Sequence, residues 1–185
     1  LRYTNSFYEL KLLQFIQEHQ KKRGLFIDVG ANIGNHTVFF SKFCADKVIS
    51  IEPVKENFDL LKLNIEENDL QNITLYNAPI SNKRAKYIYK TVKINMGLCN
   101  MEESEQGVDA LLAEDLTIEN LTLIKIDCEA MSMAVFESFK FLILKFIPDL
   151  VIEATKEELA YILKQIPYKI VGRFNSTPTY YLSPI

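Results

Sequence analysis

Short apolar runs alternate with amphipathic stretches along most of this chain. Five runs have the length and the β-branched content of buried strands: 25–29, 47–51, 72–76, 121–126 and 149–152. Between and after them apolar residues recur at helical spacing, which predicts helices over 37–43, 55–68, 131–146 and 156–165. This alternation predicts an α/β fold, a Rossmann-like doubly wound and mostly parallel sheet with right-handed crossovers.

The two ends of the chain complete this picture. Residues 6–20 have the pattern of an amphipathic helix, and the polar segment 21–24 ends it. Two final strands, 168–171 and 179–182, are expected to pair as an antiparallel hairpin at the sheet edge. With no linker in between, we expect residues 1–185 to form a single domain, an N-terminal helix in 1–23 and a Rossmann-like core in 24–185.

The middle of the chain is less regular. Residues 85–94 alternate enough to predict a hairpin arm, and 109–115 predict a short helix or turn. Residues 95–107 contain two glycines, three acids and two asparagines, which predicts a loop. A long loop beside a site often serves as a lid or contacts the substrate.

Composition restricts the function classes. The chain has 185 residues, 48% apolar and 24% charged, with a net charge of −3, which argues against broad binding to nucleic acid. No apolar run is long enough to span a membrane, and the first residues do not resemble a signal peptide. Three scattered cysteines have no metal-ligand spacing, so we expect reduced thiols, no metal and a cytoplasmic location.

The candidate site begins after the first predicted strand. The loop there has the spacing Asp-x-Gly-x-x-x-Gly, with Asp28, Gly30 and Gly34. In the dinucleotide fingerprint a middle glycine lets a pyrophosphate approach the backbone. Asn32 occupies that position here, and Asp28 before the turn repels phosphate and attracts a cation. The loop therefore favours a ligand with an amino group and a sulfonium over a dinucleotide.

A second acid, Glu52, ends the next predicted strand. In doubly wound sheets an acid at this place accepts hydrogen bonds from both hydroxyls of a ribose. Together, the loop and the acid indicate a nucleoside-containing cofactor with a positive centre.

Four segments resemble the FkbM family of class I S-adenosylmethionine-dependent methyltransferases. They are 26–35 (FIDVGANIGN), 51–58 (IEPVKENF), 108–112 (VDALL) and 123–131 (LIKIDCEAM). The similarity extends from about Gly24 to Glu153. It implies a class I methyltransferase-like fold, S-adenosyl-L-methionine as cofactor, and a hydroxyl acceptor on a sugar, glycan or other small molecule.

The resemblance also implies roles for residues. The methionine part of the cofactor is expected near Asp28, Gly30, Ala31, Asn32, Gly34 and Asn35. The ribose is expected at Glu52 and Pro53, and the adenine near Asn77 and Ala78. Asp127 is expected beside the methionine part or the acceptor, and Glu129 is expected to face the acceptor.

Methyl transfer from a sulfonium depends mainly on alignment, but an alcohol acceptor also benefits from a general base. The candidates are Asp127 and Glu129, which alternate along an extended chain, and His36. For Asp127 a hydrogen bond to the cofactor or to the backbone is the other interpretation. For His36 the other interpretation is a local hydrogen bond.

Three other functions compete with this one. A nicotinamide-dependent dehydrogenase is disfavoured because the middle glycine is missing. A nucleic-acid methyltransferase is disfavoured by the acidic balance. A degenerate fold that binds a nucleoside or partner without catalysis is the main alternative, because Ala130 and Ser132 replace the glycine and the acid usual in the family. These departures affect the acceptor side, which we expect to comprise 95–107, 127–130 and the chain ends.

Overall fold

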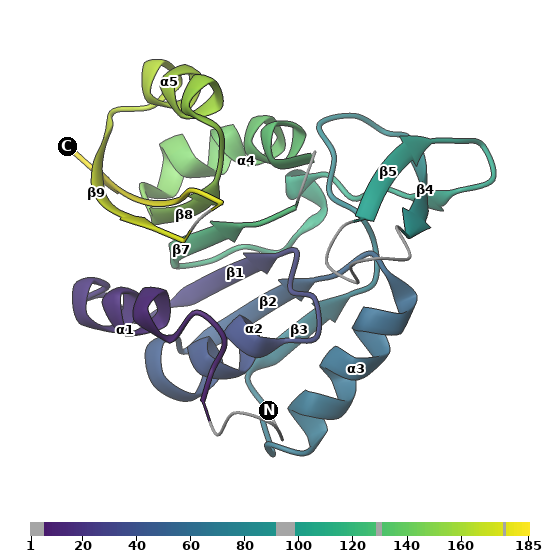
Figure 1. Ribbon diagram of the computed structural model, residues 1–185, viewed down its shortest axis with the longest axis horizontal. Coiled ribbons are helices and arrows are strands. Elements are labelled where there is room, and N and C mark those ends of the chain that lie inside the picture. The colour runs from purple at the N-terminus through teal and green to yellow at the C-terminus, as the bar shows by residue number, and fades with distance from the viewer. Residues whose placement is uncertain (1–5, 92–98, 129–130, 176) are drawn as a thin grey trace.

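The chain forms a central, mostly parallel sheet with helices on both faces (Figure 1). The computed structural model describes residues 6–91, 99–128, 131–175 and 177–185. Within them the main sheet has the strand order β3-β2-β1-β7-β8-β10-β9. Its strands are β1 Leu25–Val29, β2 Lys47–Ile51, β3 Ile73–Tyr76, β7 Leu121–Ile126, β8 Asp149–Glu153, β9 Tyr168–Phe174 and β10 Thr179–Pro184. The predicted fold class is confirmed, including the antiparallel hairpin of β9 and β10 at the edge.

Each face of the sheet is covered by its own helices. α1 (Leu10–His19) and α2 (Asn35–Phe39), which continues as the π-helical turn Phe40–Cys44, pack on Phe26, Leu123 and their neighbours. α3 (Lys55–Glu66) packs beside them on β3. α4 (Ser132–Phe146) and α5 (Lys156–Gln165) cover the opposite face. Successive side chains of β1 point to opposite faces of the sheet, so Leu25, Ile27 and Val29 pack on the α4 side and Phe26 packs on the α1 side.

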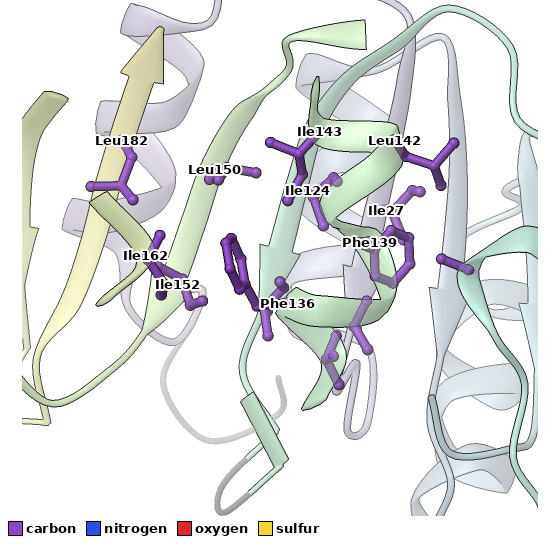
Figure 2. Close-up of a cluster of buried hydrophobic side chains, with 14 of the residues drawn as sticks. Ile27, Ile124, Phe136, Phe139, Leu142, Ile143, Leu150, Ile152, Ile162 and Leu182 are labelled. Carbon is purple, nitrogen blue, oxygen red and sulfur yellow. The ribbon is translucent and has the colours of Figure 1, made fainter. Parts of the chain in front are cut away.

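α4 contributes most of the helical side of the larger core. Its residues Phe136, Phe139 and Ile143 are fully buried against the strand residues Ile27 and Ile124, as Figure 2 shows. Burying an apolar side chain of this size contributes roughly 1.5–3 kcal/mol. This packing holds β1 and β7 in place, and the candidate site lies at the carboxyl ends of these strands.

The start of α5 lies directly after β8. Thr155 accepts a hydrogen bond from the Glu158 amide at 3.2 Å, and the Glu158 carboxylate accepts one from the Thr155 amide at 2.8 Å. This capping box explains why the helix begins at the predicted residue. It also fixes the turn that follows Glu153.

Two predictions about local structure are corrected. α1 begins at Leu10, not at Ser6, because Glu9 has a left-handed φ of 54° and breaks the helix. The predicted loop 95–107 contains a strand, β5 (Cys99–Glu103), which pairs with β4 (Lys86–Thr91); β4 also pairs with β6 (Val108–Asp109). This small sheet projects at the upper right of Figure 1, and the 3-10 turn Ala113–Asp115 follows it.

Candidate functional site

The loop after β1 is a tight turn in which three residues have positive φ. Gly30, Asn32 and Gly34 have φ values of 76°, 51° and 90°. A Cβ on Gly30 would lie 1.8 Å from the carbonyl oxygen of Asp127. Glycine is therefore required where the end of β7 approaches the loop. Asn32 tolerates this conformation better than most non-glycine residues.

The backbone amides of this turn are directed toward β2. Those of Gly30 and Ala31 donate to the Ile51 carbonyl at 3.0 and 3.1 Å, and that of Asn32 donates to Glu52 Oε2 at 2.8 Å. These amides are therefore occupied within the protein and form no cradle for a pyrophosphate. That the loop does not bind a dinucleotide stays a prediction.

Glu52 is buried at the carboxyl end of β2, with 5% of its surface exposed. Its Oε1 accepts from the Val54 amide at 2.9 Å and its Oε2 from the Asn32 amide. Burial raises the pKa of Glu52, although these backbone hydrogen bonds oppose the shift. The Asn57 side chain also hydrogen-bonds to this carboxylate, and the lone-pair capacity that remains can accept from a donor such as a ribose hydroxyl.

Asn77 and Pro53 lie beside Glu52. The Asn77 side-chain amide donates to the carbonyl oxygens of Glu52 and Pro53 at 2.9 and 3.1 Å. Asn77 therefore holds the segment that follows β2 in place. The sequence-based expectation that Asn77 lies near the adenine of the cofactor stays a prediction.

Asp28 lies beneath the loop and is completely buried. Its Oδ1 is 3.0 Å from Lys125 Nζ, and its Oδ2 accepts from the Thr37 hydroxyl at 2.7 Å, which in turn lies 2.8 Å from the Ser50 hydroxyl. The carboxylate is thus bound directly by side chains of α2 and β7, and the β2 hydroxyl of Ser50 contacts it only through Thr37. Lys125 also contacts Asp127, so it links the buried Asp28 to an acid at the edge of the sheet.

Lys125 connects the two acids of the site. Its Nζ contacts Asp28 Oδ1, the Gly30 carbonyl at 3.3 Å and Asp127 Oδ2 at 3.5 Å. Although burial disfavours the ammonium charge, the carboxylates of Asp28 and Asp127 raise the pKa of Lys125. The lysine therefore remains charged and orients both acids.

Asp127 lies at the carboxyl end of β7, and 37% of its side chain is exposed. Its amide donates to the Val29 carbonyl at 3.1 Å. Burial favours the neutral acid, but Lys125, a hydrogen bond with Glu153 and the nearby His36 together lower the pKa of Asp127. Asp127 is thus an accessible carboxylate. The other predicted base, Glu129, and its neighbour Ala130 lie outside the described residues.

An apolar pocket lies between the loop, the end of β2 and the start of α4. It brings together the predicted cofactor residues Gly30, Pro53 and Ala78. Its lining comprises Val29, Gly30, Ile51, Pro53, Ala78, Pro79, Ile80, Met101, Cys128, Met131 and Val135. Burial raises the pKa of the Cys128 thiol, so this sulfur is a neutral, apolar part of the wall.

The segment before α1 is attached to the start of α2. The Tyr8 amide donates to Asn35 Oδ1 at 2.9 Å, and Asn35 Nδ2 donates to the Tyr8 carbonyl at 3.0 Å. Glu9 Oε2 lies 3.2 Å from His36 Nε2, and Glu9 Oε1 accepts from Asn175 at 2.7 Å. The Asn35 amide and His36 are therefore engaged by the N-terminal segment.

Sequence reasoning assigned no role to Lys125, Glu153 or Glu9. Lys125 is the single charged residue of a buried strand, and Glu153 ends the strand next to it. Both patterns mark a site at the carboxyl edge of a parallel sheet. Glu9 gave no comparable pattern. Among the described residues no three His, Cys, Asp or Glu side chains gather as metal ligands, and no helix is long and apolar enough to cross a membrane.

Comparison with known proteins supports the fold and gives a family. A family model described as the Vibrio cholerae RfbT protein matches residues 1–146. No curated protein matches the chain. A solved methyltransferase FkbM from Methylobacillus flagellatus is similar in structure, with a TM-score of 0.66 and 21% identity over 86% of this chain. The chain spans 43% of the length of that structure.

Two further solved structures share the fold at lower identity. A precorrin-6y C5,15-methyltransferase from Geobacter metallireducens has a TM-score of 0.60 and 11% identity, covering 97% of this chain and 90% of its own. A tRNA (uracil-54, C5)-methyltransferase from Pyrococcus abyssi, in complex with S-adenosyl-L-homocysteine, has a TM-score of 0.55 and 13% identity, covering 97% and 40%. The predicted resemblance to FkbM methyltransferases is confirmed at the level of the class I methyltransferase fold.

Proposed function

The chain belongs to the family of the Vibrio cholerae RfbT protein, and on its fold and site we propose that it is an S-adenosylmethionine-dependent methyltransferase. We further propose that the acceptor is a hydroxyl group on a sugar, glycan or other small molecule. Fold alone does not assign an activity, so the proposal depends on the site.

The observation that carries the proposal is the apolar pocket beside the Glu52 carboxylate. The apolar lining of the pocket is the kind of surface that an adenine face packs against, and the Glu52 carboxylate beside it can accept hydrogen bonds from ribose hydroxyls. Close to Gly30, the partly exposed Asp127 carboxylate attracts a positive centre. The chemistry of these groups fits a nucleoside with a cationic sulfur.

Each part of the site then has a task. When bound, S-adenosylmethionine supplies a methyl group on a sulfonium. Glu52 and the pocket hold the nucleoside, and Asp127 faces the acceptor. Lys125 keeps Asp127 oriented and ionised. Alignment of this kind supplies much of the catalysis in such a displacement.

Isothermal titration calorimetry separates this function from the dehydrogenase alternative. We expect S-adenosylmethionine to bind and NAD to show no measurable heat, because the loop amides are occupied by β2. Binding of NAD alone would contradict the proposal.

Transfer of a labelled methyl group then tests catalysis. We expect a panel of saccharide and small-molecule hydroxyl acceptors to yield at least one labelled product, and Asp127→Asn to reduce its formation roughly 10²-fold or more. A protein that binds the cofactor but labels no acceptor would support the degenerate alternative instead.

A further inference from the structure

We propose that Glu153 is a positioning residue of the acceptor site, which holds a proton against Asp127 and keeps Asp127 as the carboxylate that faces the acceptor. This inference rests on the proposed function. It concerns a residue at the end of β8 that the cofactor site does not use.

The sheet register brings the two acids together. β7 and β8 are parallel, with Lys125 opposite Val151 and Ile126 opposite Ile152. The next residues on the two strands are Asp127 and Glu153. Neighbours in register on parallel strands point to the same side, so both carboxyl groups lie above the same edge of the sheet. The two carboxyl groups are close enough for a hydrogen bond with Glu153 to be among the causes that lower the pKa of Asp127.

A hydrogen bond between two carboxyl groups requires a proton on one of them. The buried Lys125 ammonium lies 3.5 Å from Asp127 Oδ2, and this charge favours ionisation of Asp127. The shared proton therefore belongs on Glu153, which donates to Asp127. The pair carries one negative charge, as expected for two adjacent acids.

The remaining charged groups around the pair are consistent with this assignment. Asp28 lies beneath and shares Lys125 with Asp127. His36 on α2 favours the ionised form of Asp127, and the neutral Cys128 thiol follows in the chain. Above the pair lies the N-terminal segment, where Glu9 contacts His36. The charge of Glu9 and burial are the main causes that raise the pKa of Tyr8, and the charge of Asp127 adds to them, so the phenol stays neutral.

In the proposed reaction, Asp127 accepts a proton and Glu153 holds Asp127 in position. When bound, S-adenosylmethionine would supply the methyl group to the acceptor oxygen and keep the carbon–sulfur electron pair on sulfur, and the hydroxyl proton would pass to Asp127. Glu153 keeps its own proton throughout. Its hydrogen bond fixes which oxygen of Asp127 remains free for the acceptor.

Carbon-13 NMR of labelled side-chain carboxyls tests this arrangement without an acceptor. The Asp127 resonance is assigned from its loss in Asp127→Asn. In the wild type we expect it to shift in two steps as the pH rises, first when Asp127 ionises and again when Glu153 loses the shared proton. In Glu153→Gln the amide still donates but has no proton to lose, so the second step disappears and the first remains.

Glu157→Gln is the matched control, because Glu157 lies exposed on α5 and outside the site. We expect it to leave both steps unchanged. Thermal melting of each variant verifies that it is folded. A single Asp127 step in the wild type, or identical two-step curves in the wild type and Glu153→Gln, would overturn the inference. Failure of S-adenosylmethionine to bind in calorimetry would instead overturn the proposed function and leave the NMR result standing.

Discussion

Lys125→Met is expected to lower the free energy of unfolding by about 3–5 kcal/mol. The substitution removes the cation that pairs with Asp28, whose carboxylate is completely buried, and leaves that charge without compensation. It also releases Asp127 and the Gly30 carbonyl, the two groups that Lys125 holds at the edge of the site. Urea unfolding followed by circular dichroism measures the change.

Lys140→Met is the matched control for this effect. Lys140 pairs with Glu137 at 3.0 Å on the surface of α4, and such a pair contributes at most about 1 kcal/mol. The double variant Asp28→Leu/Lys125→Met removes both buried charges and is expected to be more stable than Lys125→Met alone. If Lys125→Met were no more destabilising than Lys140→Met, the buried pair would not support the site.

Glu52→Ala is expected to weaken S-adenosylmethionine binding about 100-fold or more. Two ribose hydroxyls donating to a carboxylate contribute roughly 1.5–3 kcal/mol each, and about 1.4 kcal/mol corresponds to a factor of ten. The variant also loses the acceptor for the Asn32 and Val54 amides, so the loop after β1 loosens. Calorimetry with the wild type and the variant gives the ratio of dissociation constants.

Glu56→Ala, on the exposed first turn of α3, is the matched control and is expected to bind normally. The pH dependence gives an independent check. Because burial raises the pKa of Glu52, its ionised form is lost at a higher pH than for an ordinary carboxyl group. Affinity should therefore fall as the pH drops through that raised pKa. Unchanged affinity in Glu52→Ala would remove the ribose role from this residue.

The strands that carry the site were predictable because they are continuous apolar runs. β1, β2 and β7 have the predicted bounds, and their buried residues are those of a sheet covered on both faces. Helix α5 also has the predicted bounds, because Thr155 and Glu158 form a local cap at its start. Features determined by neighbouring residues in the chain were therefore available from the sequence.

Features that depend on residues far apart in the chain could not be predicted from the sequence. The start of α1 depends on Tyr8 bonding to Asn35 and on the left-handed Glu9, which no helical periodicity reveals. β5 has few apolar residues and forms because β4 pairs with it. Likewise, the pairing of Asp127 with Glu153 depends on the strand order, which places β8 beside β7.

The same distinction applies to Asp28. Its position before the glycine turn suggested a direct role at the cofactor, and that role stays a prediction. The structure shows where its charge is used within the protein: Asp28 holds Lys125, and Lys125 holds Asp127. Only the three-dimensional contact between β1 and β7 reveals this connection.

A crystal structure grown with S-adenosyl-L-homocysteine tests the central claim most directly. We predict density for the ligand between Gly30 and Glu52, with its ribose hydroxyls at the Glu52 carboxylate and its adenine in the pocket beside Pro53 and Ala78. Density at another place on the sheet edge, or a pocket that stays empty at saturating ligand, would contradict the account.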